Sequence, residues 1–204
     1  MANFASLRGP VGLNRVYARV PQGRFDISTW LDSLKHGHTF ATNGPLLGLT
    51  LGGSEIGAEL QLPAGENRVP YKAWLRSIVP LDHLQLVCNG TVVEDLKLNG
   101  DRQSADREGA IPISHSGWCL LRAWADKPES PVLDLYPYAT TGPLYVKVGS
   151  SAVKSREDAA YFIAWIDRLV QAAASNPDWN TEAEKASILH LLEQARAVYE
   201  GFEK

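Results

Sequence analysis

The last quarter of the chain repeats its apolar residues every three or four positions, which is the period of a helix that buries one face. Ser155 and Thr181 each precede such a stretch, and a carboxylate follows each of them three residues later, as in a capping box. Between the stretches, residues 176–180 form the turn-like sequence Asn-Pro-Asp-Trp-Asn. We therefore expect a helical hairpin within residues 151–204, packed on the preceding domain. Its apolar positions are Phe162, Ile163, Ile166, Leu169, Val170 and Ala173, then Ile188, Leu191, Leu192, Ala195, Val198, Tyr199 and Phe202.

In residues 1–150 the apolar period changes to two, the period of a half-buried strand. Leu84, Leu86 and Cys88 occupy alternate positions, and Asn89-Gly90 then leads into a second short run. An Asn-Gly pair predicts a tight hairpin because both turn residues take a positive φ, and Gly52-Gly53-Ser54 predicts another turn. Further strands are expected at residues 16–20, 46–51, 68–77, 117–125 and 144–148. This pattern predicts an antiparallel β-sandwich of the immunoglobulin-like kind.

One helix interrupts the strands near residues 26–36. Ile27, Trp30, Leu31 and Leu34 form its apolar stripe; Asp26 or Ser28 is the expected cap, and Gly37 the left-handed terminator. The predicted fold class is therefore mainly β with α. A sandwich domain spans residues 1–150, and a helical hairpin spans residues 151–204.

Composition excludes several classes of protein. Of 204 residues, 45% are hydrophobic and 21% are charged, as in an ordinary globular protein, and no apolar run has the length of a membrane span. Twenty basic residues against 23 acidic ones give a net charge of −3, which argues against a nucleic-acid partner. Residues 1–10 lack the apolar core of a signal peptide, so the sequence as written predicts a cytoplasmic protein.

The chain has two cysteines, Cys88 and Cys119, both on expected strands. Two cysteines in a chain of this length do not make a disulfide scaffold. The positions favour two buried, unreactive thiols, and a disulfide within the sandwich stays open as the alternative.

His36-Gly37-His38 has the spacing of two metal ligands on one strand, but here Gly37 turns the chain at a helix end. A histidine at a helix C-terminus is favourable in itself, so we expect a structural role. Ser114-His115-Ser116 places a hydroxyl beside an imidazole. Adjacent residues of an extended chain point to opposite faces, and we therefore expect no proton relay there.

Six tryptophans raise the question of a sugar-stacking surface. The spacing of Trp30, Trp74, Trp118 and Trp124 favours core positions, whereas it leaves Trp165 and Trp179 undetermined. The acidic residues at 94–95 and within 101–108 are expected at a hairpin end and in a polar loop, where solvent exposure is more usual than calcium binding.

The segment Trp30 to Leu47 contains the pattern Trp-x-x-x-Leu-x-x-Gly-x-Thr-Phe-Ala-Thr-Asn-Gly-Pro. It resembles a segment of the carbaryl-hydrolase-like metallohydrolases, the CehA/McbA family of the polymerase-and-histidinol-phosphatase (PHP) superfamily. Further matches follow in the same order over residues 13–17, 86–90, 116–123, 141–146 and 160–167. The resemblance covers most of the chain.

The resemblance implies the region that follows the metal-binding barrel in such proteins, namely a β-sandwich and C-terminal helices. The barrel's ligands have no counterpart here. His36-Gly37-His38 aligns with the helix end, where relatives usually have Gly-Arg-Thr after the helix. Relatives also have Ala-His-Thr-Ser-Pro where this chain has residues 139–143, Ala-Thr-Thr-Gly-Pro, so the role of that histidine does not carry over.

Two functions follow as expectations. The preferred one is a non-catalytic C-terminal accessory domain of a PHP-type metal-dependent hydrolase, packed beside a missing N-terminal barrel to which residues 1–20 are the link. A divalent metal is then expected only in that barrel, and no cofactor in this chain. The alternative is an autonomous module that binds a carbohydrate or another small molecule. Catalysis by this chain alone is the least favoured reading.

Four residues are candidates for ligand or interface contacts: Arg15, Thr42, Asn43 and Trp179. The small, hydrogen-bonding residues of 39–45 and their Asn-Gly turn also predict a tight structural corner between helix and strand. On that hypothesis, replacing Asn43 by leucine destabilises the fold.

Overall fold

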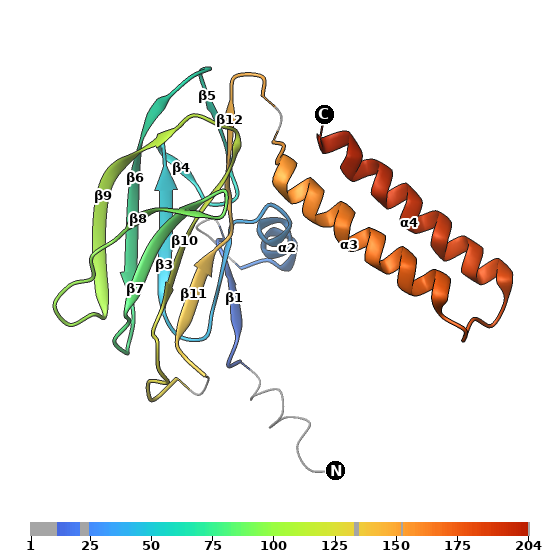
Figure 1. Ribbon diagram of the computed structural model, residues 1–204. Helices are drawn as coiled ribbons and strands as arrows, with labels where there is room; N and C mark the ends of the chain where they lie inside the picture. Colours follow the sequence, from blue (N-terminus) through green and yellow to red (C-terminus); the bar gives the residue numbers. More distant parts are fainter. Residues whose placement is uncertain (1–11, 21–24, 133–134, 152, 204) are drawn as a thin grey trace, which may run out of the picture. The chain divides into compact units, whose positions relative to one another are not determined.

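A computed structural model of the chain describes residues 12–20, 25–132, 135–151 and 153–203. The chain divides into two compact units, residues 1–152 and residues 153–204 (Figure 1). Expectations about residues 1–10 concern positions outside the described ranges.

The first unit contains two sheets. In the larger one, β10 lies at the centre, with β7 along one edge and β11 and β12 sharing the other. Its strands within the described residues are β1 (Arg15–Ala18), β2 (Thr39–Thr42), β5 (Glu59–Leu62), β7 (His83–Cys88), β8 (Thr91–Asp95), β10 (Gly117–Trp124), β11 (Tyr138–Thr141) and β12 (Leu144–Val148). The smaller sheet has the order β4 (Ser54–Glu55), β3 (Leu46–Leu51), β6 (Asn67–Arg76) and β9 (Ser104–Ile113).

One hydrophobic core joins the two sheets. Alternate residues of the longer strands point into it, as the period of two predicts: the buried members include Leu47 and Leu75 from the smaller sheet and Leu86 and Leu121 from the larger one. The predicted fold class, a mainly antiparallel sandwich with one inserted helix and a helical hairpin, is confirmed. One pair departs from the antiparallel pattern, because β5 lies parallel to β12.

Local signals placed the Asn89-Gly90 hairpin correctly. Both residues have positive φ, 48° and 80°, and join β7 to β8. The turn at Gly52-Gly53 is also present, between β3 and β4.

The polar loop expected over residues 101–108 is wrong from Ser104 onward, because that segment begins β9. Its carboxylates lie on the outer face of the smaller sheet and pair with cations of β6. Glu108 lies 2.8 Å from Lys72, and Asp106 accepts two hydrogen bonds of 2.9 Å from Arg76. Cross-strand ion pairs of this kind support a strand whose sequence looks like a loop.

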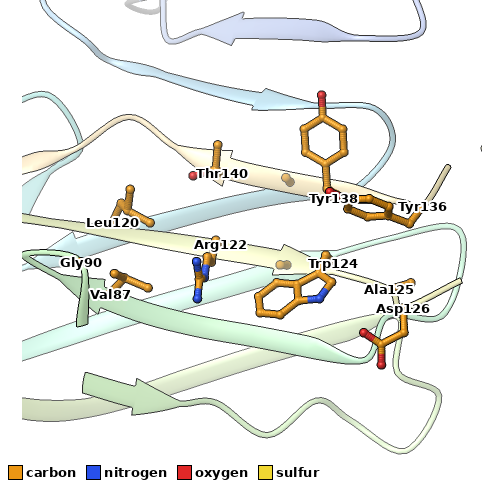
Figure 2. A pocket seen from close by; sticks show the side chains of 12 residues that line it. Val87, Gly90, Leu120, Arg122, Trp124, Ala125, Asp126, Tyr136, Tyr138 and Thr140 are labelled. Atoms are coloured by element: carbon orange, nitrogen blue, oxygen red, sulfur yellow. The ribbon is translucent and has the colours of Figure 1, made fainter. Parts of the chain in front are cut away.

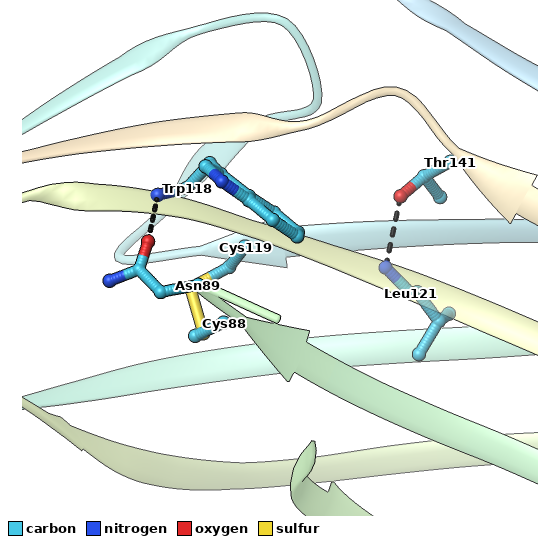
Figure 3. Close-up of a disulfide and its surroundings, with 6 residues drawn as sticks. All are labelled: Cys88, Asn89, Trp118, Cys119, Leu121 and Thr141. Atoms are coloured by element: carbon cyan, nitrogen blue, oxygen red, sulfur yellow. Dashed lines mark hydrogen bonds between the residues drawn. A yellow bond between two sulfur atoms is a disulfide. The ribbon is translucent and has the colours of Figure 1, made fainter. Parts of the chain in front are cut away.

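Cys88 and Cys119 form a disulfide, so the prediction of two free thiols is wrong and the alternative holds (Figure 3). The two residues lie directly opposite each other on β7 and β10, with Cα atoms 4.1 Å apart. Beside them, the side-chain oxygen of Asn89 accepts a hydrogen bond of 2.9 Å from the backbone N–H of Trp118. The bridge therefore joins neighbouring strands within one sheet.

The predicted core positions of the tryptophans are also wrong. Trp74 is 42% exposed on the outer face of β6. Trp118 and Trp124 are half-buried on the outer face of β10, and Trp30 is half-buried on the helix. The spacing correctly put Trp118 and Trp124 on one strand face, but periodicity alone does not tell which face the core covers.

The inserted helix is α2 (Ile27–Lys35). The side chain of Asp26 caps its N-terminus, and the hydroxyl of Ser28 together with backbone N–H groups lowers the pKa of that carboxyl from its usual value. At the other end Gly37, with φ 72°, forms a Schellman motif, in which its N–H and that of the next residue bond back into the last turn. Both ends lie where the sequence predicts them.

The second unit pairs α3 (Arg156–Ser175) with α4 (Glu182–Glu203). Ser155 and Thr181 cap the two helices as predicted. The rings of Phe162 and Tyr199 stack between the helices at a centroid distance of 4.9 Å, and Arg196 bonds to Asp167 at 2.8 Å. Packing of this hairpin on the sandwich stays a prediction. None of the described helices has the length and apolar content needed to cross a membrane.

Candidate functional site

Thr42 and Asn43 are buried at the end of β2, with 1% and 3% of their surface exposed. The Thr42 hydroxyl donates to the carbonyl of Pro45 at 2.6 Å and accepts from the N–H of Gly44 at 2.9 Å. The Asn43 amide donates to the carbonyl of Tyr136 and accepts from the N–H of Tyr138, both at 2.8 Å. These bonds join the tight corner after β2 to the segment that leads into β11, so both side chains have a structural role.

Arg15 lies beside that corner and donates to the carbonyl of Asn43 at 3.1 Å. The two residues line a cavity of about 550 Å³ together with Tyr17, Leu46 and Ile78. Three of the four candidate residues thus come together in the first unit.

Trp179 belongs to the second unit. Its indole N–H donates to the carbonyl of Ala173 at 2.9 Å, across the turn between α3 and α4. The ring is half-buried, and its one polar group closes the end of a helix. This contact gives Trp179 a structural role in the hairpin.

The two histidines beside Gly37 face different partners. His36 bonds through Nδ1 to the carbonyl of Asp32 at 2.7 Å, and His38 through Nδ1 to the carbonyl of Ile56 at 2.8 Å. Their ring centroids are 6.3 Å apart. Within the described part of the chain, no three histidine, cysteine or carboxylate residues come together as a metal site would require.

Ser114 and His115 differ from the expectation based on adjacency. The Ser114 hydroxyl lies 2.8 Å from Nδ1 of His115, because this loop is not extended at that point. Both residues are exposed, and no carboxylate among the described residues is paired with the ring. A serine nucleophile needs its base oriented and water excluded, and this loop offers neither.

A ladder of side chains crosses the outer face of the larger sheet, and Figure 2 shows three of its members, Arg122, Trp124 and Asp126. Trp124 stacks on His83 at a centroid distance of 4.4 Å, and the Arg122 guanidinium lies 5.0 Å from the Trp124 ring. Gln85 accepts from Arg122 at 2.8 Å, and Asp126 pairs with His83 at 3.0 Å. No described carboxylate forms an ion pair with Arg122, which leaves its charge open to a ligand.

The same face is hollowed beside this ladder. Arg122, Trp124 and Asp126 line a cavity of about 630 Å³ together with two tyrosines (Figure 2). Tyr136 lies just before β11, and Tyr138 is its first residue. Tyr136 is 44% exposed. The sequence placed Trp124 in the core and therefore missed this surface.

A second aromatic cavity, the Trp74 groove, is defined by Tyr17, His38, Phe40, Ile56 and Trp74 and measures about 480 Å³. Tyr17 and Phe40 stack almost parallel, with centroids 5.0 Å apart. Both Trp74 and Tyr17 keep an exposed surface, 42% and 41%. No sequence motif indicated this groove, because its residues come from strands of both sheets and meet only in the folded chain.

The chain matches no protein-family model, no curated protein and no solved structure.

Proposed function

We propose that this chain is a non-catalytic C-terminal accessory domain of a PHP-type metal-dependent hydrolase, and that it packs beside the barrel and shapes its substrate cleft. The sequence resemblance described above motivates this proposal. The hydrolytic metal belongs to the barrel, where several ligands and an open coordination position converge.

One structural observation supports an interface of this kind. The α2 face, defined as Phe25, Ile27, Leu31 and Leu34, carries its apolar side chains 64%, 65%, 52% and 39% exposed. The side of α2 that meets the sandwich is instead held by Ser33, which is 8% exposed and donates to the carbonyl of Arg19. An amphipathic helix with its apolar stripe turned outward is typical of a protein–protein interface.

The proposal is tested in the protein that carries both barrel and sandwich. Leu31→Lys places a charge in the centre of the α2 face, and Val92→Lys places one on β8, where the wild-type side chain is 40% exposed. We expect Leu31→Lys, but not Val92→Lys, to separate the melting of barrel and sandwich into two transitions and to raise KM. Equal behaviour of the two variants would contradict docking through α2.

We further propose that the domain works in an oxidising compartment, because disulfides persist there and are reduced in the cytosol. The Cys88–Cys119 bridge supports this proposal over the sequence-based expectation of a cytoplasmic protein. Thiol titration of protein purified from its source under alkylating conditions tests this. Two reactive thiols per chain after denaturation would refute it.

Carbohydrate binding on the outer face of the larger sheet is the second candidate. It is supported by the exposed Tyr136 beside Trp124 and by the open charge of Arg122, since sugars bind to aromatic rings flanked by polar groups. On a glycan array, Trp124→Ala is expected to abolish binding, whereas Trp179→Ala leaves it unchanged. Wild-type protein that retains no glycan would exclude this function.

A further inference from the structure

The Trp74 groove contains a flat ring whose position depends on a glycine. Trp74 on β6 lies directly opposite Gly48 on β3. A Cβ atom on Gly48 would come within 2.5–2.9 Å of three atoms of the indole ring. The nitrogen-bearing edge of the indole therefore lies close to the bare backbone of Gly48, and the 42% of Trp74 that stays exposed is available for stacking.

His38 supplies a polar group in the same groove. Its Nδ1 lies 2.8 Å from the carbonyl oxygen of Ile56, and a carbonyl oxygen only accepts, so Nδ1 carries the proton. In the neutral ring Nε2 is then an acceptor, and no described group is bonded to it.

The backbone around His38 is clamped by two glycines. A Cβ on Gly57 would lie 2.8 Å from the backbone nitrogen of His38, and one on Gly142 would lie 3.0 Å from the carbonyl oxygen of Thr39. Gly142 also donates its N–H to that carbonyl at 2.6 Å. These close approaches hold the backbone beside His38, and the bond from Nδ1 to the carbonyl of Ile56 orients its ring before any ligand arrives, which reduces the entropy lost on binding.

The charged side chains of the groove are already paired. Lys72 pairs with Glu108, and Arg19 pairs with Glu55. A sugar ring carries hydroxyl groups on most of its carbons and needs a polar partner for most of them, whereas apolar and aromatic side chains make up most of this lining. A planar apolar ring with a single donor matches it better.

We propose that the Trp74 groove binds a small aromatic alcohol, whose ring stacks on Trp74 and whose hydroxyl donates to Nε2 of His38. This site is independent of the proposed interface on α2 and of the outer face of the larger sheet. Its volume of about 480 Å³ lies in the range of ordinary ligand pockets.

The test uses 4-ethylphenol and its methyl ether, which share a ring but differ in the donor. Binding to the full chain is followed by NMR through the amide of Gly48 and the indole N–H of Trp74. We expect the ether to bind about tenfold more weakly, the factor that corresponds to 1.4 kcal/mol for the lost hydrogen bond.

Two variants assign the contacts. His38→Leu leaves a side chain of similar size but removes the acceptor, so we expect it to weaken phenol binding to the level of the ether and to leave ether binding unchanged. Trp74→Ala, followed through the Gly48 amide alone, is expected to weaken the binding of both ligands, and the control Trp124→Ala the binding of neither. Melting curves verify that each variant is folded. Equal binding of phenol and ether to the wild-type chain, no binding of either, or loss of binding in Trp124→Ala would overturn the proposal.

Discussion

Replacement of Asn43 by leucine is the most direct test of the corner that joins β2 to β11. Leucine has nearly the same size but cannot form either hydrogen bond, so the carbonyl of Tyr136 and the N–H of Tyr138 lose their side-chain partner. Each buried group left unpaired costs about 1–3 kcal/mol, which gives about 2–6 kcal/mol in the free energy of unfolding. For a unit of this size we expect Tm to fall by at least about 4 °C.

Two further variants separate this effect from a general loss of an asparagine. Asn43→Asp keeps the acceptor for Tyr138 but turns a buried carboxylate oxygen toward the carbonyl of Tyr136, so at neutral pH its loss of stability should be at least as large as that of Asn43→Leu. Asn99 also makes two side-chain hydrogen bonds, to Ser104 and Arg107, but it is exposed. We expect Asn99→Leu to change stability by no more than about 0.5 kcal/mol. The assay is urea and thermal unfolding followed by circular dichroism, and equal midpoints for Asn43→Leu and wild type would refute a structural role.

Three other changes test separate features of the fold. Replacing both Cys88 and Cys119 by alanine removes a cross-link between positions 31 residues apart, and loop entropy predicts a loss of about 3–4 kcal/mol in urea unfolding; an unchanged midpoint would contradict the bridge. Gly109→Ala places a Cβ within 2.7–2.8 Å of the buried Tyr71 ring, so unfolding should become about 1–3 kcal/mol easier; a neutral effect would mean that the ring can move aside. The N-cap of α2 is the carboxylate of Asp26, whose pKa is lowered in the folded chain. Its contribution to stability is therefore complete above the unfolded pKa of 3.8 and is lost as the pH falls through the lower folded pKa. In Asp26→Asn, amide shifts of the first turn of α2 should no longer titrate at acid pH, and persistence of the titration would assign it to another group.

Features set by a few neighbouring residues could be predicted from the sequence. The hairpin at Asn89-Gly90 and the caps at Ser155 and Thr181 depend on local backbone geometry, and each lies where the pattern placed it. The same holds for the end of α2 at Gly37. Local chemistry therefore gave the elements and the fold class.

Features set by strand pairing could not be predicted in the same way. The acidic run at the start of β9 resembles a loop until its cationic partners on β6 are known. Nothing in a spacing of 31 residues says that Cys88 lies opposite Cys119. β2, β5 and β11 are four residues long, too short for a clear period.

The candidate sites show the same division. Thr42 and Asn43 were correctly grouped with a tight corner, because an Asn-Gly pair and a hydroxyl are turn signals in themselves. The Trp74 groove depends on Gly48 lying opposite Trp74, which only the register of β3 and β6 reveals. Periodicity also left the choice between core and outer face open for Trp124, and the choice made was wrong.

The proposal that this chain is an accessory domain of a metallohydrolase is tested most directly by sequencing the coding DNA immediately upstream of the Met1 codon in the source genome. We predict an open reading frame that continues without interruption into a barrel containing a His-x-His motif. An in-frame stop codon directly upstream, with no barrel encoded, would contradict the proposal and would favour a free-standing binding protein.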